Sequence, residues 1–132
     1  MTKQSSTHIV LVVEDDPGVR ESICEVLADS GYAPMIAGNG REALDRLHAS
    51  PSKPCIILLD IMMPVMDGRE FRREQQSDPE LADIPVVILS AHANVEDAAK
   101  AMHVSEALRK PVQLDALMNV IGRFCKPDDA SN

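Results

Sequence analysis

The sequence predicts a doubly wound α/β domain, in which helices cover both faces of a parallel sheet. Two observations predict this class: short apolar runs alternate with helical patterns along the chain, and polar residues follow the runs at their carboxyl ends. Continuous apolar runs are typical of strands buried on both faces of a parallel sheet. We expect a (βα)5 sandwich.

Length and composition indicate one compact domain. The chain has 132 residues, 45% of them hydrophobic, which provides a single core. We expect the domain to span residues 8–125, between disordered tails at 1–7 and 126–132. Aromatic residues make up only 2%, so the core must be built from aliphatic side chains.

Five apolar runs are the predicted strands. Most are continuous and rich in β-branched residues, whereas the last is short and weak. They cover residues 8–13, 33–37, 55–59, 85–89 and 106–108.

Helices are predicted between these strands from apolar spacing and end signals. Pro17 opens the first helix and Gly31 stops it. Asn39 can cap the second helix, with Glu42 as its partner in a capping box. A weaker helix over 67–76 is expected because parallel strands need a crossover connection. Two further helices are expected from Asn94 to about His103 and from Leu114 to Phe124.

Polar residues at the strand ends are expected to meet in one pocket, because ligands bind outside the carboxyl ends of such strands. In chain order these residues are Glu14, Asp15, Asp16, Asp60, Ser90 and Lys110. Carboxylates close together repel one another unless a proton or a cation lies among them. A set of hard oxygen ligands without Cys or His favours Mg²⁺, or Mn²⁺, over zinc.

Asp60 is the candidate nucleophile of this pocket. It stands alone at the end of the most apolar strand, and an aspartate can form an acyl phosphate. A metal held by few carboxylates keeps positions open for phosphate oxygens, while Lys110 and Ser90 complete a clamp around a phosphoryl group. The pocket therefore predicts phosphoryl transfer.

Four segments resemble the receiver domain of response regulators in two-component signalling. They are "LVVEDD" at 11–16, "LLDIMMPVMDG" at 58–68, "VVILSA" at 86–91 and "LRKP" at 108–111. The resemblance covers nearly the whole chain, and it implies the flavodoxin-like version of the doubly wound fold, with the five strands in the order 2-1-3-4-5.

The resemblance implies roles for the reactive residues. Asp60 matches the phosphoryl acceptor, Lys110 matches the residue that pairs with the phosphate, and Ser90 matches the switch hydroxyl. A histidine kinase or a histidine phosphotransfer protein would donate the phosphoryl group, and the same site would later hydrolyse it. The chain would then catalyse only its own modification and would not be an enzyme in the ordinary sense.

The resemblance also implies a metal-ligand set. Asp15 matches the direct ligand of Mg²⁺, Glu14 an acid that acts through water, and the main-chain carbonyl of Met62 the third protein ligand beside Asp60. Asp16 is an additional acid without an assigned role.

The resemblance further implies that output passes to a downstream protein, which binds the face made by the fourth helix, the fifth strand and the fifth helix. Many receivers carry an aromatic residue three positions before the lysine, but Ala107 stands there. Val112 likewise stands where a phenylalanine is common. We therefore expect activation through backbone shifts in the loop from Ser90 to Asn94 and in the fourth helix.

Met62 and His92 are candidates for tuning the lifetime of the phosphoryl group. Each lies two positions after a reactive residue, where receivers often control access of water to the site. A surface role without functional effect is the alternative for His92.

Two other functions are compatible with the sequence. A degenerate receiver would bind partners without phosphorylation, and Ala107 keeps this alternative open. An aspartyl-phosphate phosphohydrolase of the haloacid-dehalogenase type would need a second aspartate where Met62 stands.

Charge and cysteine content narrow the partners and the location. A net charge of −8 disfavours nucleic acid, and the apolar runs are too short to span a membrane. Cys24, Cys55 and Cys125 are expected to be free, buried thiols in a reducing cytoplasm. We expect a standalone regulator that is a monomer or a weak dimer.

Overall fold

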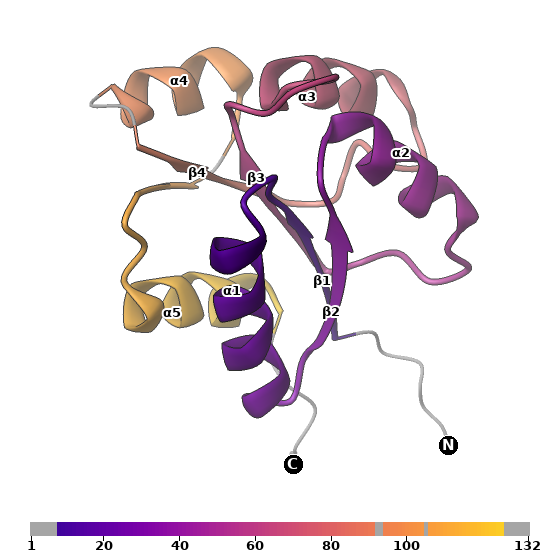
Figure 1. Cartoon of the computed structure of the whole chain (residues 1–132). Coiled ribbons are helices and arrows are strands. Elements are labelled where there is room, and N and C mark those ends of the chain that lie inside the picture. The colour runs from indigo at the N-terminus through magenta and orange to yellow at the C-terminus, as the bar shows by residue number, and fades with distance from the viewer. Residues whose placement is uncertain (1–7, 92–93, 105, 126–132) are drawn as a thin grey trace.

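A five-stranded parallel sheet forms the centre of the protein, in the strand order β2-β1-β3-β4-β5. The computed structural model describes residues 8–91, 94–104 and 106–125 (Figure 1). The predicted order and the flavodoxin-like architecture are confirmed. The strands are β1 (Ile9–Val13), β2 (Ala33–Ala37), β3 (Ile56–Asp60), β4 (Val86–Ser90) and β5 (Glu106–Arg109).

Helices form a layer on each face of the sheet (Figure 1). One layer contains α1 (Pro17–Asp29) and α5 (Leu114–Phe124), and the other contains α2 (Gly40–Ala49), α3 (Gly68–Ser77) and α4 (Val95–Met102). Successive side chains of a strand point to opposite faces, so each central strand contributes to both cores. In β1, Val10 and Val12 pack on the α1/α5 side, whereas Leu11 and Val13 pack on the opposite side.

The central strands are the best predicted elements. Every residue of β3 and of β4 is buried, as a sheet covered on both faces requires. Both strands begin and end one residue later than the apolar runs suggested, because Asp60 and Ser90 still pair with the neighbouring strands. The weak run at 106–108 is a strand that pairs with β4 along its length.

The predicted helix ends are correct in position, but two of their details are wrong. Gly31 follows α1 with φ of +92°, a conformation that glycine adopts at little cost. The Asn39 side chain accepts the amide of Glu42 at 2.9 Å, as expected. However, the Glu42 carboxylate accepts the amide of Gly38 rather than that of Asn39, so the capping box is not closed. Asn94 precedes α4 without a side-chain cap.

Helix α3 has a stronger start signal than its charged sequence suggested. Asp67 and Glu70 form a complete capping box, in which each side chain accepts the other residue's backbone amide. Phe71 is fully buried under this helix. The pattern of an aspartate followed three residues later by a glutamate could have identified this helix without the crossover argument.

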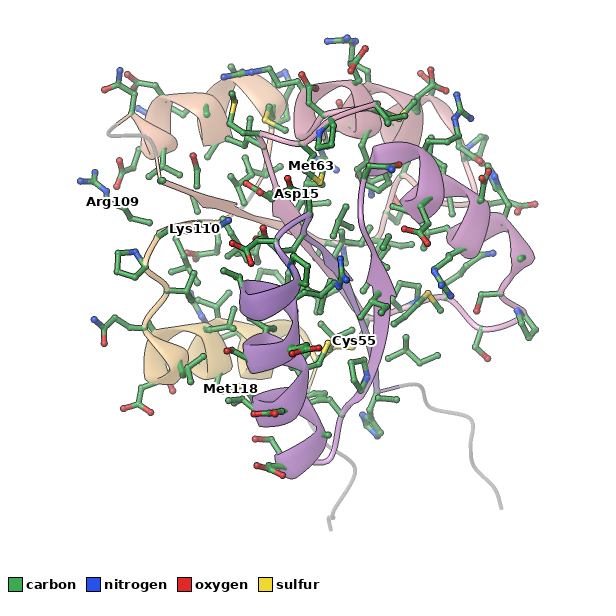
Figure 2. The ribbon with its side chains drawn as sticks, in the orientation of Figure 1. Asp15, Cys55, Met63, Arg109, Lys110 and Met118 are labelled. Atoms are coloured by element: carbon green, nitrogen blue, oxygen red, sulfur yellow. A yellow bond between two sulfur atoms is a disulfide. The ribbon has the colours of Figure 1, made fainter. Side chains whose placement is uncertain are left out.

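The prediction of three free cysteines is wrong for two of them. Cys55 and Cys125 form a disulfide with their Cα atoms 5.6 Å apart, whereas Cys24 is free. Their sequence separation is 70 residues. The bond joins the chain just before β3 to the residue after α5. It lies at the opposite end of the strands from Asp15 and Lys110 (Figure 2). Such a long-range pair leaves no local signal in a sequence.

Other expectations concern the chain ends and membranes. The predicted tails at 1–7 and 126–132 lie outside the described residues. Among the helices that the structure describes, none has the length and the apolar character needed to cross a bilayer.

Candidate functional site

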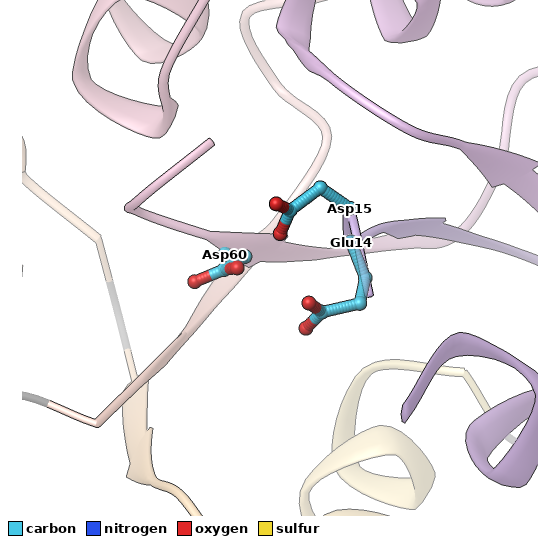
Figure 3. A group of neighbouring side chains, drawn as sticks. All are labelled: Glu14, Asp15 and Asp60. Atoms are coloured by element: carbon cyan, nitrogen blue, oxygen red, sulfur yellow. The ribbon is translucent and has the colours of Figure 1, made fainter. Parts of the chain in front are cut away.

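The carboxyl ends of β1 and β3 bring the predicted acidic residues together. Asp60 is the last residue of β3 and is 5% exposed, and Glu14 directly follows β1 and is 1% exposed. Asp15 is the next residue and is exposed. One oxygen from each carboxylate lies within 4.8 Å of the other two, as Figure 3 illustrates. The spacing allows one cation to contact all three residues.

Lys110 lies among these carboxylates. Its Nζ donates to Oε1 of Glu14 at 2.7 Å and lies 3.3 Å from Oδ2 of Asp60. The main chain fixes this position, because the amide of Lys110 donates to the carbonyl of Ser90 at 2.8 Å. The strong pairing of Lys110 with Glu14 was not part of the sequence prediction, which assigned the lysine to the phosphate.

The electrostatics of the cluster appear in the pKa of Asp60. Burial, and then the negative charge of Glu14, raise this pKa to about 6, although Lys110 and the amide of Met62 oppose the rise. Burial lowers the pKa of Lys110, but the hydrogen bond from Lys110 to Glu14 and the two carboxylate charges outweigh it and raise that pKa. At neutral pH the cluster therefore holds one more buried negative charge than its lysine neutralises.

This charge excess is the observation that fits a divalent cation. The three carboxylates supply hard oxygen ligands, and among the residues that the structure describes no sulfur or imidazole ligand belongs to the cluster. A bound cation would remove the repulsion between Glu14 and Asp60 that raises the Asp60 pKa. The donor set thus suits Mg²⁺ or Mn²⁺, as the sequence predicted.

Ser90 and Met62 also lie at this site. Ser90 ends β4, is 1% exposed and follows the residue that pairs with Asp60. The amide of Met62 lies 3.4 Å from Oδ1 of Asp60, while 61% of the Met62 residue is exposed. The structure therefore brings Glu14, Asp15, Asp60, Met62, Ser90 and Lys110 to one edge of the sheet, where Figure 2 shows Asp15 and Lys110.

Asp16 has a structural role that the sequence analysis did not assign. Its Oδ1 accepts the amides of Gly18 at 2.9 Å and of Val19 at 3.3 Å, so it caps the start of α1. Asp16 followed by a proline at the first helical position is a typical start signal that could have been recognised.

We predict that Asp16→Ala lowers the free energy of unfolding by about 1 kcal/mol, because the helix loses its N-cap. The affinity for Mg²⁺ should not change. Urea unfolding and a metal titration measure the two quantities. Asp16→Asn is the control, since asparagine caps equally well but carries no charge. A large loss of metal affinity in both variants would make Asp16 a ligand instead.

Gly68 lets the chain pass very close to the end of β3. A Cβ atom at this position would lie 2.6 Å from the carbonyl oxygen of Asp60 and 2.8 Å from the Cα of Ile61. Both atoms are backbone, so the end of β3 would have to move. The glycine therefore allows the backbone of Asp60 to keep its position at the end of β3.

We predict that Gly68→Ala lowers the free energy of unfolding by about 1–3 kcal/mol, the usual cost of overpacking, and weakens Mg²⁺ binding. Gly122→Ala in α5 is the control, because nothing lies within 4 Å of its added Cβ. Chemical unfolding and metal titration of both variants test this. Equal behaviour of the two variants would show that the close approach at Gly68 is unimportant.

One positioning residue was missed by the sequence analysis. Nη1 of Arg20 donates to the carbonyl oxygen of Glu14 at 3.0 Å, which ties the acidic loop to the first turn of α1.

Ala107 lies in β5, half buried against the core on the α4 side. His92 lies outside the described residues, as does part of the loop from Ser90 to Asn94.

Comparison with known proteins gives a consistent result. Residues 10–122 match the family model described as the response regulator receiver domain. The response regulator MprA of Mycolicibacterium vanbaalenii is 35% identical over 127 residues, which are 92% of this chain and 53% of that protein. MprA of Mycobacterium tuberculosis strain H37Rv is also 35% identical and is covered to 54%. This chain spans about half the length of these curated relatives.

Solved structures show the same architecture. The phosphorylated cyanobacterial phytochrome response regulator RcpA is 32% identical with a TM-score of 0.77, over 96% of this chain and 98% of that one. The chemotaxis protein CheY4 of Vibrio cholerae is 27% identical with a TM-score of 0.80, over 90% and 99% of the two chains.

Proposed function

Because this chain belongs to the family of response regulator receiver domains, we propose that it accepts a phosphoryl group on Asp60 from a phosphohistidine of a partner protein. The observation that carries the proposal is the position of Asp60. This carboxylate ends a fully buried strand beside two further acids and Lys110. The donor would be a histidine kinase or a histidine phosphotransfer protein.

The chemistry follows from the groups at the site. The pKa of about 6 leaves Asp60 mainly ionised at neutral pH, so its carboxylate can attack phosphorus. The bond between phosphorus and the donor histidine nitrogen breaks, and a new bond joins phosphorus to the Asp60 oxygen. Asp15, Asp60, the main-chain carbonyl of Met62 and, through water, Glu14 would hold Mg²⁺. When bound there, the ion would supply positive charge that neutralises the transferring group.

Lys110 and Ser90 would respond to the new phosphoryl group. Lys110 lies between Glu14 and Asp60, and a dianionic phosphoryl group on Asp60 offers it additional acceptor oxygens. Ser90 lies on the neighbouring strand, where its hydroxyl can donate to the same group. A shift of Ser90 would move the start of α4, because the loop between them is short. Attack by water on phosphorus later restores the Asp60 carboxylate.

The signal would leave through the face formed by α4, β5 and α5, where a downstream protein binds. Ala107 cannot act as a bulky rotamer switch on this face. We therefore keep the proposal that activation moves the backbone of the loop after β4 and of α4. A degenerate receiver remains the second candidate, and only the missing aromatic residue favours it.

The direct test is incubation of the protein with acetyl phosphate, followed by intact-mass measurement and peptide mapping. We expect the mass to increase by one phosphoryl group on Asp60 when Mg²⁺ is present, and no increase with EDTA. Asp15→Asn should suppress the modification and excess Mg²⁺ should partly restore it. If wild-type protein with Mg²⁺ remains unmodified, the degenerate binding module becomes the better explanation.

A further inference from the structure

Helices α3 and α4 lie next to each other on the same face of the sheet (Figure 1). Residues of both helices line a groove between them. Two pockets, of about 240 and 180 Å³, make up this groove, and Arg69 is part of the lining of both. The first pocket begins at the loop after β3, and the second reaches the end of α4. Besides Arg69, the lining residues are Ile61, Met62, Asn94, Ala98, Arg72, Arg73, Gln76, Ala101 and Met102.

The two walls of the groove differ in chemistry. Arg69 and Arg73 stand one helical turn apart on α3, and both are exposed. Within the described part of the chain, neither arginine forms an ion pair. The α4 wall presents the small side chains of Ala98 and Ala101, which allow another backbone to approach closely. The groove thus combines a cationic wall on α3 with small apolar side chains on α4.

Arg72 holds the two helices together at the end of the groove near Met102, before any partner binds. It is 8% exposed and donates from Nε to the carbonyl of Met102 at 3.0 Å and from Nη2 to the carbonyl of His103 at 2.6 Å. Its Nη1 also donates to Gln75 at 2.7 Å. These bonds join α3 to the carboxyl end of α4, where a cation is favourable. A partner would therefore find walls that are already in place.

We propose that this groove binds an acidic, amphipathic helical segment of a partner protein. In a chain with a net charge of −8, two arginines that form no ion pair with any described residue favour carboxylates at this site. The wall from Arg69 to Gln76 is about 10 Å long, which corresponds to two helical turns of a ligand. A long polyanion or an anionic membrane would extend over the negatively charged remainder of the surface, which disfavours both.

Met62 connects this groove to the acidic cluster. Met62 lines the first pocket, which begins at the loop after β3, and it is 61% exposed although it is apolar. A leucine of the partner can cover this side chain, because methionine is flexible and adapts its shape to an apolar partner. The amide of Met62 lies 3.4 Å from Asp60, so an occupant would contact the loop that follows the reactive carboxylate. The proposal goes beyond the proposed function, because it requires no phosphoryl transfer.

The test is a titration of a fluorescein-labelled synthetic helix of about four turns. Leucines at positions i, i+3, i+4 and i+7 form one side of it, and glutamates flank them. Full-length protein without phosphoryl donor is added, and fluorescence anisotropy is read at low and high salt. We expect saturable binding that weakens with salt. A helix with lysines in place of the glutamates should not bind.

Matched charge variants locate the binding. Arg69→Glu with Arg73→Glu should weaken binding by about tenfold or more, because the carboxylates would face like charges. Arg41→Glu with Arg46→Glu, two exposed residues of α2, changes the net charge equally and should alter binding by less than about twofold. Met62→Ser should weaken binding without any change of charge. In amide NMR, shifts should concentrate in α3 and α4.

The proposal fails if the glutamate helix does not bind, or if the two double variants weaken it equally. It also fails if the shifts lie on other elements. Heparin and phosphatidylglycerol vesicles are the remaining comparisons. If either one binds through Arg69 and Arg73 more tightly than the helix does, the groove is a site for that polyanion and not for a protein segment.

Discussion

Asp60→Asn is expected to abolish phosphoryl acceptance while making the metal-free protein more stable. An amide oxygen cannot form the acyl phosphate, so no modification should be detected with acetyl phosphate and Mg²⁺. The same change removes a charge that the fold holds at a cost, because burial and Glu14 raise the pKa of Asp60 to about 6. Function and stability should therefore change in opposite directions.

The pH dependence has a defined sign. An unfolded aspartate has a pKa of 3.8, so the folded protein binds more protons than the unfolded chain between about pH 4 and pH 6. The contribution of Asp60 to stability is complete below pH 4 and is lost as pH rises through 6. Above pH 6, the free energy of unfolding of Asp60→Asn should be higher than that of wild type by up to about 2–3 kcal/mol, since each pKa unit corresponds to about 1.4 kcal/mol.

Urea unfolding at several pH values without metal measures this difference, which should shrink towards zero near pH 4. Saturating Mg²⁺ should also reduce it, because the ion stabilises wild type more than the variant. Beryllofluoride with Mg²⁺ provides the functional control: amide shifts should appear around Asp15, Ser90 and Lys110 in wild type only. A variant that is less stable at every pH would contradict the proposed repulsion between Glu14 and Asp60.

The sequence predicts the position of the site well, because each reactive residue follows a strand that is recognisable locally. Parallel strands present their carboxyl ends at one edge, so the convergence of Asp15, Asp60 and Lys110 follows from the order of elements. The pairing inside the site is less predictable. That Lys110 donates to Glu14 depends on how β1 and β5 are placed across the sheet, which residue type does not reveal.

Helix α3 illustrates a second limit. The helix was predicted only weakly because its sequence is mostly charged, yet its polar residues Arg72 and Gln75 are buried. Gln75 donates to the carbonyls of Leu81 and Ile84, so polar side chains satisfy backbone groups between α3 and β4. Periodicity of apolar residues cannot detect a buried face that is built in this way.

Loss of the disulfide between Cys55 and Cys125 is the change with the second largest expected effect. The cross-link closes a segment whose ends are 70 residues apart. The chain-entropy relation gives about 4 kcal/mol for a loop of this size, because the bond restricts the unfolded chain. Reduction, or Cys125→Ser, should lower the melting temperature by about 10 °C or more. Cys24→Ser is the matched control, since Cys24 is free and should leave the melting temperature nearly unchanged.

The location of the bond separates its effect on stability from any effect on phosphorylation. It ties the residue after α5 to the start of β3, where the Tyr32 hydroxyl also donates to the carbonyl of Cys125. Asp60 lies at the other end of the same strand, five residues from Cys55. Reduced protein that remains folded should thus accept phosphoryl groups from acetyl phosphate at the wild-type rate, while amide hydrogens in the last turn of α5 exchange faster. An unchanged melting temperature after verified reduction would mean that packing around Tyr32 holds the end of α5 in place without the bond. A reduced rate of phosphorylation would mean that β3 transmits the effect of the missing bond to Asp60.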